Sequence, residues 1–192
     1  MEFDGLGQGV TLTSSISLTG DFTIEFILYY TASGHLFVDT TGSDRITISG
    51  SQIRFEISGA NVSINAGLET SKVLRIRIER SGSDIDIYKD NVLQGSGTWA
   101  NTQVINAFAK KRGAATTVPS LEGYLKDITI DDAGTVYYWA GDEGTGVTIT
   151  ESNQGNDGTF DGTWNGLLTD ETGLSQVETL QSNGWTVVSY NQ

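Results

Sequence analysis

The sequence predicts an all-β protein, built as a two-sheet antiparallel β-sandwich. Apolar and polar residues alternate along many short segments; in residues 22–30, Phe22, Ile24, Phe26 and Leu28 share one face. The chain contains 24 glycines and one proline, which fits short strands joined by tight turns because glycine readily adopts positive φ angles. A length of 192 residues is enough for one domain of this class.

Three segments after the first long strand read as a meander, at residues 45–49, 52–58 and 61–65, with turns at 50–51 and 59–60. This register puts apolar residues on one face and charged residues on the other. A slip of one residue would bury the charges, so the register is well specified. The expected cross-strand pairs are Ile48–Ile53, Ile46–Phe55, Ile57–Val62 and Arg45–Glu56.

A second hairpin is predicted for residues 72–80 and 83–89, around a turn at Ser81-Gly82. Asp90-Asn91 is expected to make the next tight turn, because both residue types tolerate left-handed geometry. Residues 122–131 and 135–140 read as the last long strands. The pairs expected in the hairpin are Ile78–Ile85, Ile76–Ile87 and Arg77–Asp86.

Residues 167–192 differ in pattern from the sandwich at residues 1–166. Ser175 and Glu178 have the spacing of a capping box, and Asn183-Gly184 is a helix stop signal. We therefore expect a short helix at 175–182, followed by a strand at 185–190. This helix–strand extension would pack on the sandwich or on a neighbouring subunit.

Charge and composition exclude several classes of function. A net charge of −13 argues against nucleic acid as a partner, because phosphate binding needs a clustered basic surface. The chain has no cysteine, so neither disulfides nor cysteine-ligated zinc sites are expected. No apolar run approaches the length of about 20 residues that a membrane span needs. The chain opens directly into a strand-like pattern, and we expect no secretory signal.

The candidate catalytic residues do not form a recognisable enzyme motif, and we expect no enzymatic activity. His35 is the one histidine, and no GxSxG nucleophile elbow is present. Two carboxylates about 5–5.5 Å apart would be needed for retaining glycoside hydrolysis. The nearest candidates are Asp84 with Asp86, which share a strand face, and Asp131 with Asp132. A solvated ladder of charges explains Asp84 and Asp86 better, since Arg77 is expected opposite them.

Two acidic loops are candidate Ca²⁺ sites, because this ion binds six to eight oxygen ligands from carboxylates, carbonyls and amides. The loops are residues 39–44, with Asp39 and Asp44, and residues 153–161, with Asp157 and Asp161. The alternative is that these Asp-Gly and Asn-Asp pairs only form turns.

A glycan site needs an exposed aromatic ring with amide or carboxylate groups around it. Trp99, in a loop with Asn101, is the first candidate, and Trp164 beside Asn165 is the second. The alternative for each tryptophan is packing in the core.

The segment from Tyr137 to Trp164 contains an aromatic strand, the run Asp142-Glu143-Gly144-Thr145-Gly146 and the turn Gly155-Asn156-Asp157-Gly158. It resembles the closing stretch of LamG and concanavalin A-like domains. Residues 86–92 are similar to their IYVDGV hairpin, and 123–131 to another of their strands. The resemblance covers residues 1–166 and implies a jelly-roll sandwich. Relatives often carry calcium, which adds to the expectation of Ca²⁺.

The resemblance implies a non-enzymatic, lectin-like display module with weak glycan binding. A phage virion protein, as capsid decoration or tail-associated adhesin, is the favoured setting, and a carbohydrate-binding module of a bacterial surface or secreted system is the alternative. The expected partners are other virion or surface-assembly proteins in an oligomeric assembly, and glycans. The expected location is the virion surface or the extracellular space.

Overall fold

The computed structural model describes residues 1–5, 8–57, 59–110, 120–141 and 148–160. These residues form fifteen strands in two antiparallel sheets and no helix. The seven-stranded sheet contains β1 (Glu2–Asp4), β12 (Glu122–Asp132), β13 (Thr135–Trp139), β3 (Phe22–Ala32), β8 (Leu74–Ser81), β9 (Asp84–Lys89) and β10 (Val92–Thr98). The eight-stranded sheet contains β14 (Thr148–Ile149), β15 (Gly158–Phe160), β2 (Val10–Leu18), β11 (Gln103–Phe108), β4 (His35–Val38), β5 (Arg45–Ser49), β6 (Gln52–Ile57) and β7 (Ala60–Asn65).

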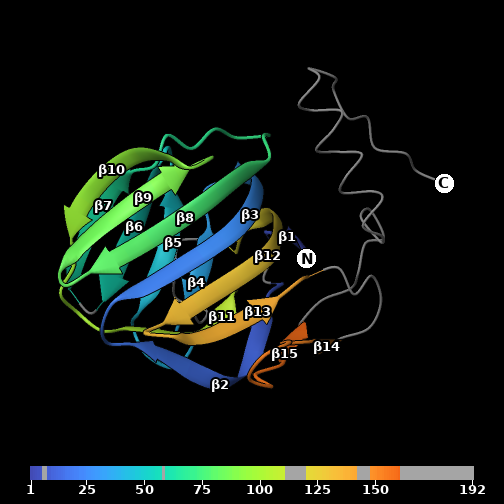
Figure 1. Ribbon diagram of the computed structural model, residues 1–192. Coiled ribbons are helices and arrows are strands. Elements are labelled where there is room, and N and C mark those ends of the chain that lie inside the picture. Colours follow the sequence, from blue (N-terminus) through green and yellow to red (C-terminus); the bar gives the residue numbers. More distant parts are fainter. Residues whose placement is uncertain (6–7, 58, 111–119, 142–147, 161–192) are drawn as a thin grey trace.

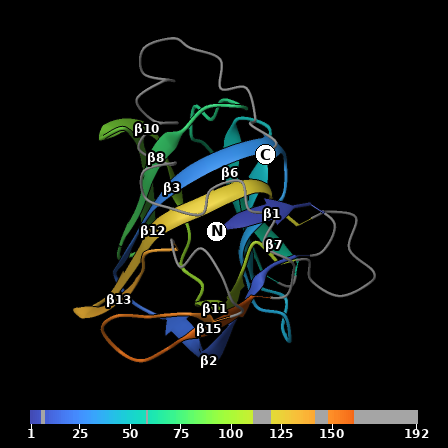
Figure 2. The same cartoon turned by 90° about the vertical axis from the view of Figure 1, so that its right-hand side faces the viewer.

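The two sheets lie face to face, and this confirms the expected sandwich. In Figure 1, β3, β8 and β9 lie in front of β4, β5 and β6. In Figure 2, which turns the molecule by 90°, β1 lies beside β12 near the middle of the view. None of the described residues forms a helix long and apolar enough to cross a membrane.

The core lies between the sheets and is held by aromatic contacts that cross from one to the other. Phe26 of β3 meets Phe37 of β4 edge to face, with ring centroids 5.3 Å apart. A second contact joins Phe108 of β11 to Trp139 of β13, also edge to face, with ring centroids 4.9 Å apart. Such pairs contribute about 0.5–1.5 kcal/mol each beyond their buried area. The alternation read from the sequence therefore identifies the buried face correctly.

The predicted register of the meander is confirmed between β5 and β6. Ile46 pairs with Phe55 and Ile48 with Ile53. Arg45 lies opposite Glu56 and forms an ion pair with it. Between β6 and β7 the prediction is wrong by two residues, because Val62 pairs with Phe55 rather than with Ile57.

The predicted register of the next hairpin is wrong by the same amount. Ile78 pairs with Ile87 rather than Ile85, because the turn lies at Gly82-Ser83, one residue later than expected. Arg77 lies opposite Tyr88 instead of Asp86, and its guanidinium lies 4.0 Å from the ring centroid in a cation–π contact. A slip of two residues keeps every side chain on its own face, so the burial pattern does not reveal it.

Two other predictions concern the turn after β9 and the C-terminal extension. The turn at Asp90-Asn91 is confirmed, with φ angles of 51° and 64°, as a type I′ hairpin turn requires. The extension at 167–192, with its helix at 175–182 and strand at 185–190, lies outside the described residues.

The pairing of β12 with β3 shifts its register between Glu122 and Gly123, and the two backbones lie unusually close there. Gly123 has a φ angle of 148°, and a Cβ placed there would lie 2.0 Å from the carbonyl oxygen of Tyr29. We expect Gly123→Ala to lower the free energy of unfolding by about 2–4 kcal/mol, from backbone strain and steric overlap. Chemical denaturation monitored by tryptophan fluorescence measures the change.

Gly20→Ala is the matched control, because a Cβ at Gly20 meets open space. We expect it to change stability by less than about 0.5 kcal/mol, as for an ordinary surface substitution. Equal effects of the two substitutions would contradict this account of the close approach at Gly123.

Candidate functional site

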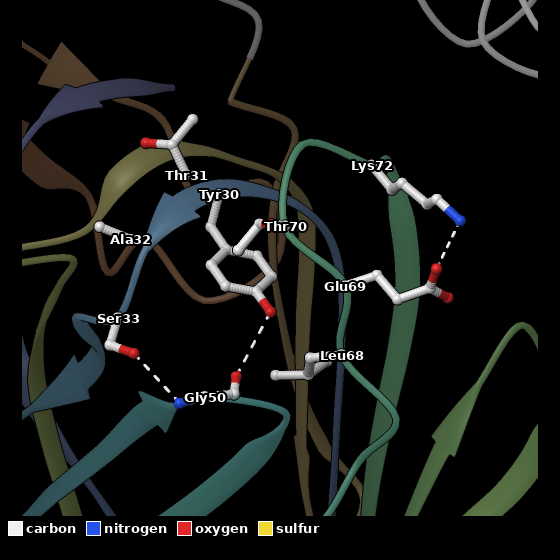
Figure 3. A pocket seen from close by; sticks show the side chains of 9 residues that line it. All are labelled: Tyr30, Thr31, Ala32, Ser33, Gly50, Leu68, Glu69, Thr70 and Lys72. Atoms are coloured by element: carbon white, nitrogen blue, oxygen red, sulfur yellow. Dashed lines mark hydrogen bonds and ion pairs between the residues drawn. The ribbon is translucent and has the colours of Figure 1, made fainter.

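A pocket with a volume of about 590 Å³ opens at one end of the sandwich. It lies where β3 ends, between the β5–β6 turn and the segment that crosses from β7 to β8. Both sheets therefore contribute to its wall, as Figure 3 shows. Its lining residues are Tyr30, Thr31, Ala32, Ser33, Gly50, Leu68, Glu69, Thr70 and Lys72.

The crossing segment, residues 66–73, is tied by its backbone to both sheets. The amides of Ala66 and Leu68 donate to the carbonyl oxygen of Ser51 at 3.1 and 3.2 Å, in the turn of the eight-stranded sheet. The amide of Ser71 donates to the carbonyl of Tyr30 at 2.8 Å, in the seven-stranded sheet. The segment bridges the two layers, and its own backbone hydrogen bonds hold the wall that it forms.

A cluster of one carboxylate and two ammonium groups closes the outer side of this wall. Lys89 Nζ donates to Glu69 Oε1 at 3.0 Å and to the carbonyl of Gly67 at 2.8 Å. Lys72 also pairs with Glu69. Hydrogen bonds from Lys72 and then Lys89, with their charges, hold the pKa of Glu69 below its ordinary value of 4.5. The carboxylate is therefore ionised and accepts hydrogen bonds at neutral pH.

Tyr30 forms the inner wall of the pocket. Its side chain points toward the β5–β6 turn (Figure 3), and the hydroxyl donates to the Gly50 carbonyl at 3.4 Å. The Gly50 amide donates to Ser33 Oγ at 3.1 Å, which joins the turn to the end of β3. Burial, and then the charge of Glu69, raises the pKa of Tyr30 above 10.0, so the phenol stays neutral.

The lining offers hydroxyl groups, one ion-paired carboxylate and a small apolar surface. Thr31, Ser33 and Thr70 carry aliphatic hydroxyls, Tyr30 carries a phenolic one, and buried Leu68 supplies apolar surface. Glu69 is the one carboxylate among the nine lining residues. This set can exchange hydrogen bonds with a polyhydroxylated molecule, but it lacks the second carboxylate that glycoside hydrolysis needs.

The tryptophan expected to provide a glycan platform lies in the core. Trp99 is 3% exposed, and its ring packs against Phe55 with centroids 6.1 Å apart. A buried indole cannot stack on a ligand, so the alternative of core packing holds for this residue. Asn101 is exposed, and its carbonyl accepts a hydrogen bond from Arg80 at 2.9 Å. Trp164 and Asn165 lie outside the described residues.

In the first candidate calcium loop, Asp39 and Asp44 organise the backbone. Asp39 Oδ1 accepts hydrogen bonds from Thr41 N, Thr41 Oγ1 and Asn106 Nδ2 at 2.9, 2.7 and 2.8 Å. Asp44 Oδ2 accepts one from the Val104 amide at 2.8 Å. Burial raises the pKa of Asp39, but the hydrogen bonds outweigh it and leave the pKa below 3.8. These are the contacts of a turn-forming loop.

The second candidate loop is organised by Glu151, a residue that the sequence analysis did not identify. Glu151 is 4% exposed and accepts hydrogen bonds from the amides of Tyr138, Asn153, Gln154 and Asn156. Asp157 Oδ1 accepts from the Glu151 amide at 2.9 Å.

The other predicted ligand of this loop, Asp161, lies outside the described residues. Among the residues that the structure describes, no group of three or more His, Asp or Glu side chains could hold a metal ion.

The carboxylates considered for hydrolysis lie apart from the pocket. Asp84 and Asp86 project from β9, opposite Ser81 and Glu79, and Asp86 accepts a hydrogen bond from Ser96. Asp131 accepts one from the Gly134 amide at 2.7 Å and so closes the β12–β13 turn.

Two further residues considered from the sequence, Asp132 and His35, lie within strands. Asp132 follows Asp131 directly in a strand, so the two side chains point to opposite faces. His35 is fully buried in β4, where its backbone pairs with Thr47 and Ser120.

The role of Glu151 can be tested by substitution and by acid. We expect Glu151→Gln to lower the free energy of unfolding by about 2–3 kcal/mol, because the amide group of glutamine cannot accept the bonds that one carboxylate oxygen accepts. Burial raises the pKa of Glu151, but the four amides outweigh it, and the pKa lies below 4.5.

Since the pKa in the folded protein is lowered, the contribution of Glu151 is fully present above pH 4.5 and is lost as the pH falls through the lowered value. Denaturant titrations between pH 7 and pH 3 measure this loss. The acid-induced decrease should be smaller in Glu151→Gln than in the exposed control Glu122→Gln. Identical pH profiles for the two variants would contradict the assignment.

Comparisons with known proteins support the fold. No protein-family model matches the chain, and no curated protein matches it either. Among solved structures it is similar to a candidate carbohydrate-binding protein from Bacteroides ovatus ATCC 8483, with a TM-score of 0.60 and 11% identity. That match covers 82% of this chain and 58% of the other, so the chain spans less than two thirds of that protein.

Two further likenesses are too weak to carry an argument. One is to a heptameric SAP-like pentraxin from Limulus polyphemus, with a TM-score of 0.42, 11% identity, and 67% of this chain and 77% of that one covered. The other is to sheep galectin-11, with a TM-score of 0.40 and 8% identity. This match covers 61% of this chain and 94% of the galectin chain. The sheet topology and the Bacteroides likeness together show the fold, an all-β jelly-roll sandwich.

Proposed function

We propose that this protein is a non-enzymatic, lectin-like module that binds a saccharide in the pocket at the end of β3. The observation that carries the proposal is the wall formed by residues 66–73, which backbone hydrogen bonds tie to both sheets. A wall held by the protein's own backbone hydrogen bonds loses little binding energy to loop ordering.

The chemistry of the lining matches that of a sugar ring. A saccharide presents hydroxyl groups, which donate and accept hydrogen bonds, around small patches of C–H surface. Glu69 accepts hydrogen bonds, Lys72 donates them, and the hydroxyl of Thr70 does both. Leu68 supplies an apolar contact. A volume of about 590 Å³ falls within the range of about 300–1,000 Å³ that is usual for small-ligand sites.

We place this module on the outside of a larger assembly, with a phage virion as the favoured setting, either as capsid decoration or as a tail-associated adhesin. The support is the LamG-like sequence pattern together with the lectin-like fold. A carbohydrate-binding module of a bacterial surface or secreted system is the alternative, and the Bacteroides likeness favours it. Loss of assembly on removal of 167–192, without measurable glycan affinity, would favour a purely structural virion role.

Substitutions at Thr70 test the pocket. A glycan array identifies a ligand, and calorimetry then measures its affinity for the full chain. We expect Thr70→Trp to abolish binding, because the indole would fill the pocket. Thr70→Val should weaken binding roughly tenfold through the loss of one hydroxyl.

The matched controls are Thr135→Trp and Thr135→Val, at an exposed threonine on β13. They should leave the affinity unchanged. Absence of binding to every glycan, or equal binding by Thr70→Trp and the unaltered chain, would contradict the proposal.

The non-enzymatic part of the proposal has its own test. We expect no release of reducing sugar from any β-glucan or from the glycan identified on the array. The physical reason is that the pocket contains one carboxylate, already paired with two lysines, whereas the reaction needs two. Hydrolysis that disappears in Asp84→Ala or Asp86→Ala would show that the protein is an enzyme.

A further inference from the structure

Two edge strands lie together on one side of the sandwich. β10 ends the seven-stranded sheet and β7 ends the eight-stranded sheet, and Figure 1 shows both strands at the same side. They approach closely because β10 contains glycine at the contact: a Cβ added to Gly95 would lie 2.5 Å from the Asn65 carbonyl oxygen. Within the described part of the chain, β10 pairs only with β9, and β7 only with β6.

The two edge strands themselves carry no charge. Neither β7, with the sequence ANVSIN, nor β10, with VLQGSGT, contains a charged residue or a proline. The neighbouring strands β8 and β9 differ sharply, because seven of their fourteen residues are Asp, Glu, Lys or Arg. Natural proteins usually protect an edge strand from pairing with charges or proline, and both are missing from this pair of edges.

The same side also exposes apolar surface. Val92 and Leu93, at the start of β10, are 61% and 50% exposed. Among the described residues, these two are the large hydrophobic residues with exposed side chains. An exposed apolar pair on an uncharged edge strand is typical of a surface that is covered by another protein.

We propose that the β7–β10 side is the surface through which two copies of this chain associate, with β10 of one copy antiparallel to β10 of the other. The net charge of −13 makes two copies repel each other wherever their charged surfaces meet. Strands β7 and β10 contain no charged residue, so the repulsion is smaller where these strands meet than where charged strands meet. A strand can always pair with its own copy across a two-fold axis, because such an interface is self-complementary.

The geometry of β10 sets the position of the axis. The ladder between β9 and β10 shifts its register between Leu93 and Gly95, and it is regular from Gly95 to Thr98. Pairing therefore runs along residues 95–98, with the two-fold axis between Ser96 and Gly97. Val92 and Leu93 of each copy then pack against the far end of the β10 strand of the other copy. The seven-stranded sheet becomes continuous across the pair.

Analytical ultracentrifugation of the full chain tests the association. We expect a monomer–dimer equilibrium that strengthens between 50 mM and 500 mM NaCl, because salt screens the repulsion between two acidic copies. Leu93→Glu should raise the dissociation constant at least tenfold. Thr135→Glu, which adds the same charge on β13 at the other side of the sheet, should change it less than twofold.

A monomer at every concentration and salt level would overturn the proposal, and so would a dimer that Leu93→Glu leaves unchanged. Circular dichroism shows whether each variant is folded. If Leu93→Glu is not, Val92→Glu replaces it with the same expectation.

A cross-link provides an independent measurement, because the chain contains no cysteine. Ser96→Cys places one thiol near the proposed axis, where the partner's thiol is within disulfide distance. Under mild oxidation we expect most of this variant to form a covalent dimer, and little of the control Thr135→Cys. Equal cross-linking of the two variants would overturn the proposed axis.

Discussion

The pocket depends on the hydrogen bonds that hold the crossing segment 66–73 between the two sheets. Ser51 accepts bonds from it on one side and Tyr30 on the other, and Lys89 reaches both Gly67 and Glu69. Without these ties the segment would be an ordinary surface connection, which is more mobile than the strands that it joins. The core fixes the distance between the two sheets. The segment spans this distance at the end of the sandwich and forms one wall of the pocket.

The sequence predicted the sandwich because period-two alternation directly reflects which face of a strand is buried. The same property explains why two of its registers were wrong. Ile78 pairs with Ile87 instead of Ile85, yet both pairings leave isoleucines inside. Alternation fixes the face, whereas the turn fixes the register, and the turn at Gly82-Ser83 lies one residue from the expected one.

The pocket could not be predicted because no local pattern encodes it. Its lining comes from the end of one strand, a hairpin turn and a crossing segment, brought together by non-local pairing. The acidic residues of the two predicted calcium loops organise the backbone of these loops. Asp39 and Glu151 both accept several hydrogen bonds inside turns, and a sequence does not distinguish such a carboxylate from a metal ligand. Trp99 was misleading for a similar reason, since its Gly- and Asn-rich surroundings do not reveal that the ring points inward.

The most direct test of the saccharide site is an NMR titration of the isotope-labelled chain with the glycan that the array identifies. The account predicts that amide shifts concentrate in residues 30–33, 49–51 and 66–72, with little change on the outer faces of the sheets. Shifts that map instead to an outer face or to residues 161–192, with the pocket amides unmoved, would contradict it.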